Sequence, residues 1–363
     1  MSAELKLQKL DTWFDDVKKP LIIAGPCSAE TKEQLFETCK DIYEKTDVRV
    51  MRAGVWKPRT RPGTFEGTGV EALKWIAELK KEIPVKFAVE VANPLHVEAA
   101  LKYGIDILWI GARSTVNPFT VQEIADTLKG VDVPVLVKNP INPDFALWLG
   151  ALERLNKCGV EKLGAIHRGY SSFQKTKYRN VPMWKFPIEL KEIYPDMPII
   201  GDPSHIGGTR DLILPISQQS LDLNYDGLMI ETHRDPDNAW SDAKQQVTPP
   251  VLADIIKELQ TKNPTVADTD FNTFMDDMRD EIDNVDRELL ELLARRTAIV
   301  EKIGEFKKQK DVTVLQENRW REIHKTRAEW GKSLKLDEAF VDELVKLIHV
   351  SSINRQEEII ANK

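Results

Sequence analysis

Four side chains that could take part in catalysis or ligand binding lie close together in the stretch Gly201–Arg210. They are Asp202, Ser204, His205 and Arg210. The apolar run Met197–Ile200 precedes them and is typical of a buried strand. Pro203 and the pair Gly207-Gly208 oppose any further strand or helix, so we expect a plain turn here. Polar turns often collect such residues without a function, but the same pattern recurs along the chain and therefore indicates a site.

Cationic residues follow several other apolar runs of the first 260 residues. They are Arg52, Lys57, Arg59, Arg113, Lys138 and Arg168. Guanidinium groups bind phosphate and carboxylate through paired N–H donors, and lysine adds a point charge. Any one of them could instead pair with an acidic neighbour. As a group, in a chain of net charge −7, they predict a site for ligands with several negative charges.

A second set of residues combines a thiol, an imidazole and two carboxylates. Its members are Cys27, His205, Glu231 and Asp242. Such a mixed set suits a divalent first-row metal such as Mn, Fe, Co or Zn, and it differs from the Cys-rich set of a structural zinc. Cys39 and Cys158 fall in helical patterns, where a free cysteine usually packs as a small hydrophobic residue.

These residues need a scaffold, and eight β-rich apolar runs alternate with amphipathic helical segments. The expected strands are Leu21–Ala24, Val48–Arg52, Val85–Val91, Ile107–Ile110, Val135–Lys138, Leu163–His167, Met197–Gly201 and Leu228–Glu231. Eight such units over about 250 residues predict an α/β fold, the (β/α)8 TIM barrel, whose active site lies at the C-terminal ends of the strands. A doubly wound open sheet is the alternative, but no Gly-x-Gly-x-x-Gly turn follows the first strand.

The pattern changes after the barrel. Residues 263–269 are polar and aperiodic and contain Pro264, so we expect a linker between a barrel of residues 1–262 and a helical unit of residues 270–363. The expected helices of that unit are Phe271–Lys310, Asn318–Arg327 and Asp337–Asn362. Three helices of this size bury little apolar area alone, so we expect a homodimer, or a higher homo-oligomer, formed through the long helix.

The composition argues against nucleic-acid-binding, membrane-spanning and disulfide-rich secreted proteins. Of the 363 residues, 42% are hydrophobic and 30% charged, and the acidic balance gives no reason to expect nucleic acid or an anionic membrane as a partner. Three cysteines without disulfide-like spacing fit a reducing compartment. The N-terminal residues lack a signal-peptide core, and no apolar run approaches a membrane span. We therefore expect a cytoplasmic protein.

Five segments of the barrel resemble the short, type I beta form of 3-deoxy-D-arabino-heptulosonate 7-phosphate (DAHP) synthase. They are Gly25-Pro26-Cys27-Ser28, Lys57-Pro58-Arg59-Thr60, Gly111-Ala112-Arg113, Asp202-Pro203-Ser204-His205 and the segment from Glu231 to Asp242. The resemblance implies a metal-dependent barrel that joins phosphoenolpyruvate to erythrose 4-phosphate, the first step of the shikimate pathway. A sister family acts on arabinose 5-phosphate and carries an Asn-rich segment in place of Lys57-Pro58-Arg59-Thr60, so this chain favours the four-carbon sugar. Another sugar-phosphate aldol-type enzyme remains the alternative for the barrel.

The same resemblance implies a role for each candidate residue. Cys27, His205, Glu231 and Asp242 would be the metal ligands. Lys57 would protonate the new alkoxide, and Arg59 and Thr60 would hold the phosphate of the sugar. The residues around phosphoenolpyruvate would be Arg52, Lys57, Arg113, Lys138 and Arg168.

The long helix resembles the all-helical bacterial chorismate mutase over Met278–Lys307, which includes Asp286, Leu289-Leu290 and Gly304. The resemblance implies an intertwined dimer in which Arg296 and the partner chain's Arg279 grip the two carboxylates of chorismate. Lys307 and Gln356 would donate to the ether oxygen, with Arg319 and Ser352 as further binding residues. Two positions depart from the family pattern: Trp320 replaces a Glu that meets the substrate hydroxyl, and Gln316 replaces an acid.

Two readings of the helical unit remain open at this point. It is either a second enzyme or a non-catalytic ligand sensor and dimerisation module, the reading that Trp320 favours. Only about twenty residues precede the first strand, which leaves no room there for a separate regulatory domain. We therefore expect chorismate or prephenate, bound at Arg279, Arg296 and Lys307, to inhibit the barrel allosterically.

Overall fold

The computed structural model describes residues 4–14, 18–57, 63–173, 175–262 and 269–361. The chain divides into two compact units, Met1–Pro264 and Thr265–Lys363. Each unit is described by itself below.

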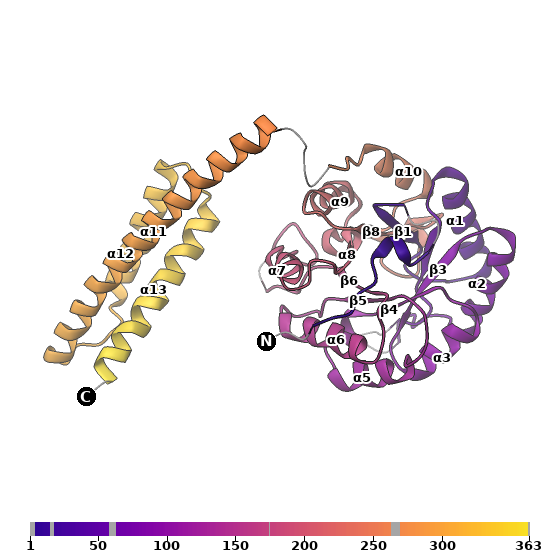
Figure 1. Cartoon of the computed structure of the whole chain (residues 1–363), viewed down its shortest axis with the longest axis horizontal. Coiled ribbons are helices and arrows are strands. Elements are labelled where there is room, and N and C mark those ends of the chain that lie inside the picture. The colour runs from indigo at the N-terminus through magenta and orange to yellow at the C-terminus, as the bar shows by residue number, and fades with distance from the viewer. Residues whose placement is uncertain (1–3, 15–17, 58–62, 174, 263–268, 362–363) are drawn as a thin grey trace. The chain divides into compact units, whose positions relative to one another are not determined.

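Eight parallel strands of the first unit close into a barrel in chain order, and β8 pairs with β1 to complete it (Figure 1). The strands are β1 Leu21–Gly25, β2 Val50–Ala53, β3 Lys86–Val91, β4 Ile107–Ile110, β5 Val135–Lys138, β6 Leu163–His167, β7 Ile199–Gly201 and β8 Gly227–Glu231. The predicted (β/α)8 barrel is confirmed, and each expected strand lies within two residues of its observed ends.

Helices cover the outside of the barrel. They are α1 Lys32–Lys45, α2 Val70–Glu82, α3 Pro94–Lys102, α4 Ala112–Thr115, α5 Pro118–Thr127, α6 Phe145–Lys157, α7 Lys185–Ile193, α8 Pro203–Gly207, α9 Ile213–Asp222 and α10 Pro249–Glu258. The side chains of Thr31, Asn93 and Asp144 cap α1, α3 and α6 by accepting a hydrogen bond from a backbone N–H of the first turn. Helix α7 is the helix that follows β6, as the alternation of strands and helices predicts.

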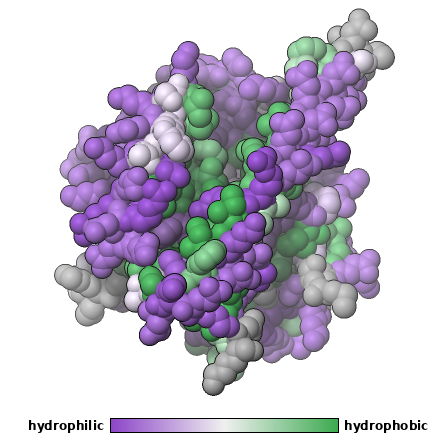
Figure 2. Space-filling model, turned by 90° about the vertical axis from the view of Figure 1, so that its left-hand side faces the viewer, coloured by the Kyte–Doolittle hydropathy of each residue, from purple (hydrophilic) through white to green (hydrophobic). Residues whose placement is uncertain are grey.

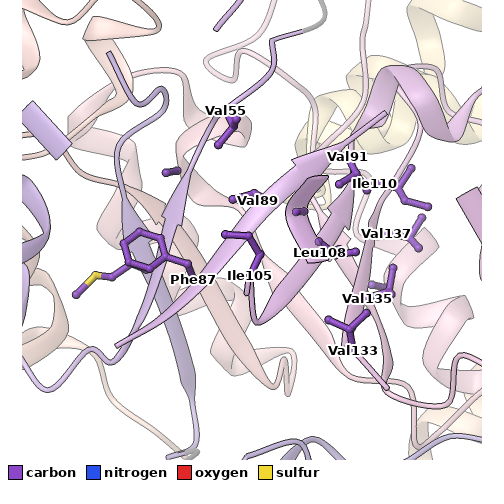
Figure 3. Close-up of a cluster of buried hydrophobic side chains, with 14 of the residues drawn as sticks. Val55, Phe87, Val89, Val91, Ile105, Leu108, Ile110, Val133, Val135 and Val137 are labelled. Carbon is purple, nitrogen blue, oxygen red and sulfur yellow. The ribbon is translucent and has the colours of Figure 1, made fainter. Parts of the chain in front are cut away.

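The barrel has two apolar layers because successive residues of a strand point to opposite sides. Phe87, Val89 and Val91 of β3 pack outwards in a cluster that Figure 3 shows together with side chains of β4 and β5. Ala88, between them, points into the barrel, where it joins a second cluster that includes Trp109. Strands buried on both faces explain the near-continuous apolar runs of the sequence.

A segment before β1 contributes to the inner layer. Leu10 and Trp13 are buried in the same cluster as the inward side chains of the strands. Gly164 of β6 makes room for the indole, because a Cβ there would lie 3.2 Å from Cη2 of Trp13 and 2.8 Å from Cδ2 of Leu136. A glycine in the middle of this strand is therefore required by packing rather than by backbone conformation.

The expectation of a plain turn after β7 was wrong, because a short helix, α8, forms there. Pro203 occupies its first turn, where no backbone donor is needed. The Asp202 side chain accepts a hydrogen bond from the His205 backbone N–H at 3.1 Å, and Gly208 ends the helix with a φ of +73°. The proline and glycines that suggested an irregular turn are thus the start and stop of a helix that carries His205.

The second unit contains three helices, α11 Thr269–Lys310, α12 Glu317–Ser333 and α13 Glu338–Ala361, and α13 packs against both others. Few of its side chains are buried within one chain; among the described residues, the apolar ones are Val300 and Val341. Many large apolar side chains of α11 are exposed, including Ile282, Leu289 and Leu290. Figure 2 shows green hydrophobic side chains gathered among the purple ones on the face towards the viewer. No helix among the described residues is both long and apolar enough to span a membrane.

Candidate active sites

A thiol and two carboxylates from both ends of the barrel sequence come together at its mouth. The ligand atoms of Cys27, Glu231 and Asp242 all lie within 4.8 Å of one another. The strand pairing of β1 with β8 explains the approach, because Gly25 lies opposite Glu231 and Cys27 follows Gly25 by two residues. Burial, and secondarily the charge of Glu231, raise the pKa of the Cys27 thiol to about 12.

His205 borders this cluster. Its Nε2 lies 3.8 Å from Oε1 of Glu231, while its Nδ1 lies 3.0 Å from Oδ1 of Asp202. Burial lowers the pKa of His205 despite the two carboxylates, so the ring is neutral near pH 7 and Nε2 is the nitrogen that faces the cluster. The Ser204 hydroxyl accepts a hydrogen bond from the Glu231 backbone N–H and joins α8 to β8. Asp202 therefore orients the ring, and α8 places it.

Two of the predicted cations are buried inside the barrel mouth. Nη2 of Arg52 lies 3.1 Å from Oε1 of Glu231, and both side chains have almost no exposure. Nζ of Lys138 lies 2.7 Å from Oδ2 of Asp202. Both cations lie near the ring of Trp109, at 5.1 Å for Arg52 and 5.7 Å for Lys138. Nε and Nη1 of Arg52 are buried and have no partner among the described residues, which leaves two donors for an anion.

Arg168 and Lys57 complete the described part of this mouth. The backbone N–H of Arg168 donates to Oδ1 of Asn139 at 2.7 Å, and its Nη1 donates to Oδ1 of Asn180 at 2.8 Å. Burial lowers the pKa of Arg168 to about 10. Nζ of Lys57 lies 3.0 Å from Sγ of Cys27. Burial lowers the pKa of Lys57, but Cys27 and Glu231 raise it by more, so the ammonium group stays protonated.

The remaining predicted cations lie differently. Arg113 is an exposed residue of α4, directly after β4. Arg59 and Thr60 lie outside the described residues. Arg179, which the sequence analysis did not select, donates from Nη1 to Oδ1 of Asp242 at 2.9 Å and also to Gln245. Asp242 itself has a φ of +46°, and Arg179 contributes to lowering its pKa.

Four candidate residues of the helical unit gather between α11 and α13. Nη1 of Arg296 donates to Oγ of Ser352 at 2.5 Å, and Nε2 of Gln356 donates to the Ser352 backbone carbonyl at 3.2 Å. Lys307 donates to the Val314 carbonyl. Burial lowers the pKa of both cations, and the charge of Arg327 contributes to lowering that of Arg296. Arg327 is thus a further cation near this cluster that the sequence analysis did not select.

Two predicted binding residues are not part of this cluster within one chain. Arg279 lies 17 residues before Arg296 on the same helix, about 25 Å away at 1.5 Å per residue, and pairs with Asp276. Arg319 pairs with Glu322 on α12. Both are exposed.

The barrel unit matches a known protein family. The profile of the DAHP synthetase I family matches residues 11–266. A Thermotoga maritima protein called phospho-2-dehydro-3-deoxyheptonate aldolase is 32% identical over 239 residues, which cover 66% of this chain and 68% of that protein. The chain belongs to the DAHP synthetase I family.

Two solved structures are similar to this chain. The solved structure of the Thermotoga maritima DAHP synthase is 30% identical with a TM-score of 0.62, covering 70% of this chain and 72% of that one. A truncated form of that synthase gives a TM-score of 0.60 at 28% identity, with coverages of 70% and 90%. A 2-dehydro-3-deoxyphosphooctonate aldolase of Brucella anthropi is 28% identical over 255 residues, covering 66% of this chain and 88% of the relative.

The helical unit that follows the DAHP synthase barrel matches a different family. The profile of chorismate mutase type II covers residues 278–357, which include Arg279, Arg296, Lys307 and Gln356. The chain therefore joins a DAHP synthase unit to a chorismate mutase type II unit, as the two resemblances predicted.

Proposed function

We propose that the barrel condenses phosphoenolpyruvate with erythrose 4-phosphate to give DAHP and phosphate. The observation that carries the proposal is Arg52, a buried guanidinium beside the Cys27, Glu231 and Asp242 cluster, with two donors that have no partner among the described residues. Arg52, Lys138 and Arg168, together with the exposed Arg113 of α4, would form a cationic surround that suits two phosphorylated substrates. Binding both substrates there holds the methylene carbon of phosphoenolpyruvate against the sugar aldehyde.

The donor set fits a divalent metal. Oε1 of Glu231 is buried, accepts no hydrogen bond from the described residues and is balanced by the charge of Arg52 at 3.1 Å, and Nε2 of His205 faces it. Cys27, His205, Glu231 and Asp242 would hold Mn, Fe, Co or Zn, and such a metal supplies Lewis acidity for polarising the aldehyde oxygen. Lys57, protonated and in contact with Cys27, would pass a proton to the new alkoxide. Water then adds at the second carbon of the former phosphoenolpyruvate, and phosphate leaves.

The sugar specificity needs a direct test, because the barrel resembles both a phospho-2-dehydro-3-deoxyheptonate aldolase and a 2-dehydro-3-deoxyphosphooctonate aldolase. Consumption of phosphoenolpyruvate should be measured with erythrose 4-phosphate and with arabinose 5-phosphate, before and after chelation. We expect turnover with the four-carbon sugar, lost on chelation and restored by added metal. Faster turnover with arabinose 5-phosphate would contradict the assignment.

We further propose that the helical unit rearranges chorismate to prephenate. This pericyclic reaction needs no nucleophile, and a pocket of fixed donors stabilises the charge that develops on the ether oxygen. Lys307 and Gln356 would supply these donors, and Arg296 would bind a carboxylate with Ser352 and Arg319. The exposed apolar side chains of α11 support a dimer in which Arg279 of the partner subunit completes the pocket.

A regulatory role for the same pocket is compatible with turnover there. We propose that prephenate bound at Arg296 inhibits the synthase of this cytoplasmic enzyme. Inhibition requires a ligand that prefers one conformational state, with a coupling free energy of typically ~1–3 kcal/mol. In the full chain, Arg296→Ala should relieve inhibition of the synthase by prephenate. Undiminished inhibition would place the effector site elsewhere, and prephenate binding without mutase turnover would favour a pure sensor.

A further inference from the structure

An aromatic pair between α12 and α13 lies beside the mutase cluster. The imidazole of His349 stacks on the indole of Trp320, with ring centroids 3.9 Å apart and planes inclined by 18°. His349 lies three residues before Ser352 and seven before Gln356, so all three side chains project from one face of α13. The stack therefore belongs to the wall that carries two of the proposed binding residues.

The free nitrogen of this imidazole is enclosed. Nε2 of His349 is buried and has no hydrogen-bond partner among the described residues. Among the described side chains of the helical unit, the other such atom is Oε1 of Gln356, on the same face of α13. Buried polar atoms are nearly always paired, so two unpaired ones on one helix face indicate the position of a polar ligand.

The surrounding charges define which kind of group the ligand presents to His349. Burial lowers the pKa of the imidazole, and the nearby cations Arg296 and Lys307 of α11 lower it further. A neutral imidazole has one nitrogen that accepts a hydrogen bond. A hydroxyl group can donate to that nitrogen, whereas the carboxylates of the same ligand are drawn to the cations.

We infer that His349 is a substrate-binding residue of the mutase pocket, whose Nε2 accepts a hydrogen bond from the ring hydroxyl of chorismate and of its product. The inference rests on the proposed mutase function. Trp320 stands where the family usually has a glutamate that meets this hydroxyl. In this chain the indole cannot take over that acceptor role, but its stack fixes the plane of an imidazole that can.

The test uses two substitutions in the full-length chain. His349→Phe keeps an aromatic ring on Trp320 and removes the nitrogen, whereas His349→Gln returns an oxygen acceptor without the ring. We expect His349→Phe to raise KM for chorismate and Kd for prephenate about three- to tenfold, as loss of one hydrogen bond does. The value of kcat should stay within about twofold, and His349→Gln should recover part of the loss.

A chorismate analogue without the ring hydroxyl separates this role from a structural one. It should bind the wild-type protein and His349→Phe equally. If His349→Phe weakens binding of the analogue and of prephenate alike, or changes neither, the inference is overturned. Absence of mutase turnover in the wild-type protein would overturn the proposed activity instead, and prephenate binding, measured by calorimetry, would still test His349.

Discussion

The ammonium nitrogen of Lys57 lies 3.0 Å from the sulfur of Cys27, a contact that joins the two sets of residues selected in the sequence. Lys57 belongs to the cations proposed to bind and protonate substrate, and Cys27 belongs to the proposed metal ligands. The barrel brings them together because each follows the C-terminal end of one of two neighbouring strands, β1 and β2. One substitution at Cys27 therefore perturbs both parts of the site.

Replacing Cys27 by alanine should abolish metal binding and DAHP formation while leaving mutase turnover unchanged. The thiolate is the softest ligand of the set, and only carboxylates and an imidazole would remain. Metal affinity is measured by competition with a chromophoric chelator. Cys158→Ala, at a half-exposed thiol, serves as the matched control. Retention of wild-type metal affinity in Cys27→Ala would remove Cys27 from the ligand set.

The sequence was informative where local pattern and global fold agree. Each barrel strand is a short apolar run, because a strand that is buried on both faces carries apolar side chains on both. This pattern is visible in the sequence without knowledge of the neighbouring strands. A closed barrel brings all C-terminal strand ends to one mouth. The predicted strands therefore also predict that Cys27, Glu231 and Arg52 lie close together. The helix at Pro203–Gly207 could not be predicted from its proline and glycines, because these residues break longer elements but also start and stop short helices.

Contacts that depend on loop conformation could not be predicted. Arg179 reaches Asp242 from the segment after β6, at a position with no recognisable spacing to any ligand.

His349 could not be singled out in the sequence for a different reason. It lies on a helix whose pattern looks like an ordinary apolar face, and its role becomes visible only in its stacking on Trp320. The three-residue spacing to Ser352 was the one signal available in the sequence.

Removing either proposed ether-oxygen donor of the mutase should lower turnover strongly. We expect Lys307→Ala and Gln356→Ala each to reduce kcat by on the order of a hundredfold, as loss of one oxyanion-type donor does. Synthase activity in the absence of prephenate should be unchanged, which also controls for folding of the barrel. Mutase turnover should be followed through the absorbance of chorismate. Wild-type turnover in both variants would show that the pocket lies elsewhere.

A methyl group at Gly164 should destabilise the barrel. The new Cβ would lie 2.8 Å from Leu136 and 3.2 Å from Trp13, so Gly164→Ala should cost about 1–3 kcal/mol of unfolding free energy. Gly150→Ala on helix α6 is the matched control, because the new Cβ would have no neighbouring atom within 4 Å. That substitution should stabilise the barrel by about 0.5–1 kcal/mol. Urea unfolding of both variants provides the comparison, and equal effects would refute the packing role of Gly164.

The stability of the barrel should depend on pH through His167. This imidazole is fully buried, lies 2.9 Å from the Tyr225 hydroxyl through Nδ1, and contacts the Pro182 carbonyl through Nε2. Burial lowers its pKa to about 4, from about 6.5 in the unfolded chain. Between these values the unfolded state binds more protons, so the stabilisation is complete above pH 6.5 and is lost as the pH falls towards 4. The loss should be on the order of 3 kcal/mol.

Substitution of this histidine isolates its contribution from that of the acidic residues that titrate in the same range. His167→Gln should be less stable than the wild-type barrel at pH 7, because the imidazole contacts are lost, but its unfolding free energy should fall less steeply from pH 6.5 to pH 4.5. His324→Gln, at an exposed histidine of the helical unit, should keep the wild-type slope of the barrel. Urea titrations at four pH values measure these slopes. Parallel curves for the wild-type protein and His167→Gln would mean that the buried imidazole does not carry the pH dependence.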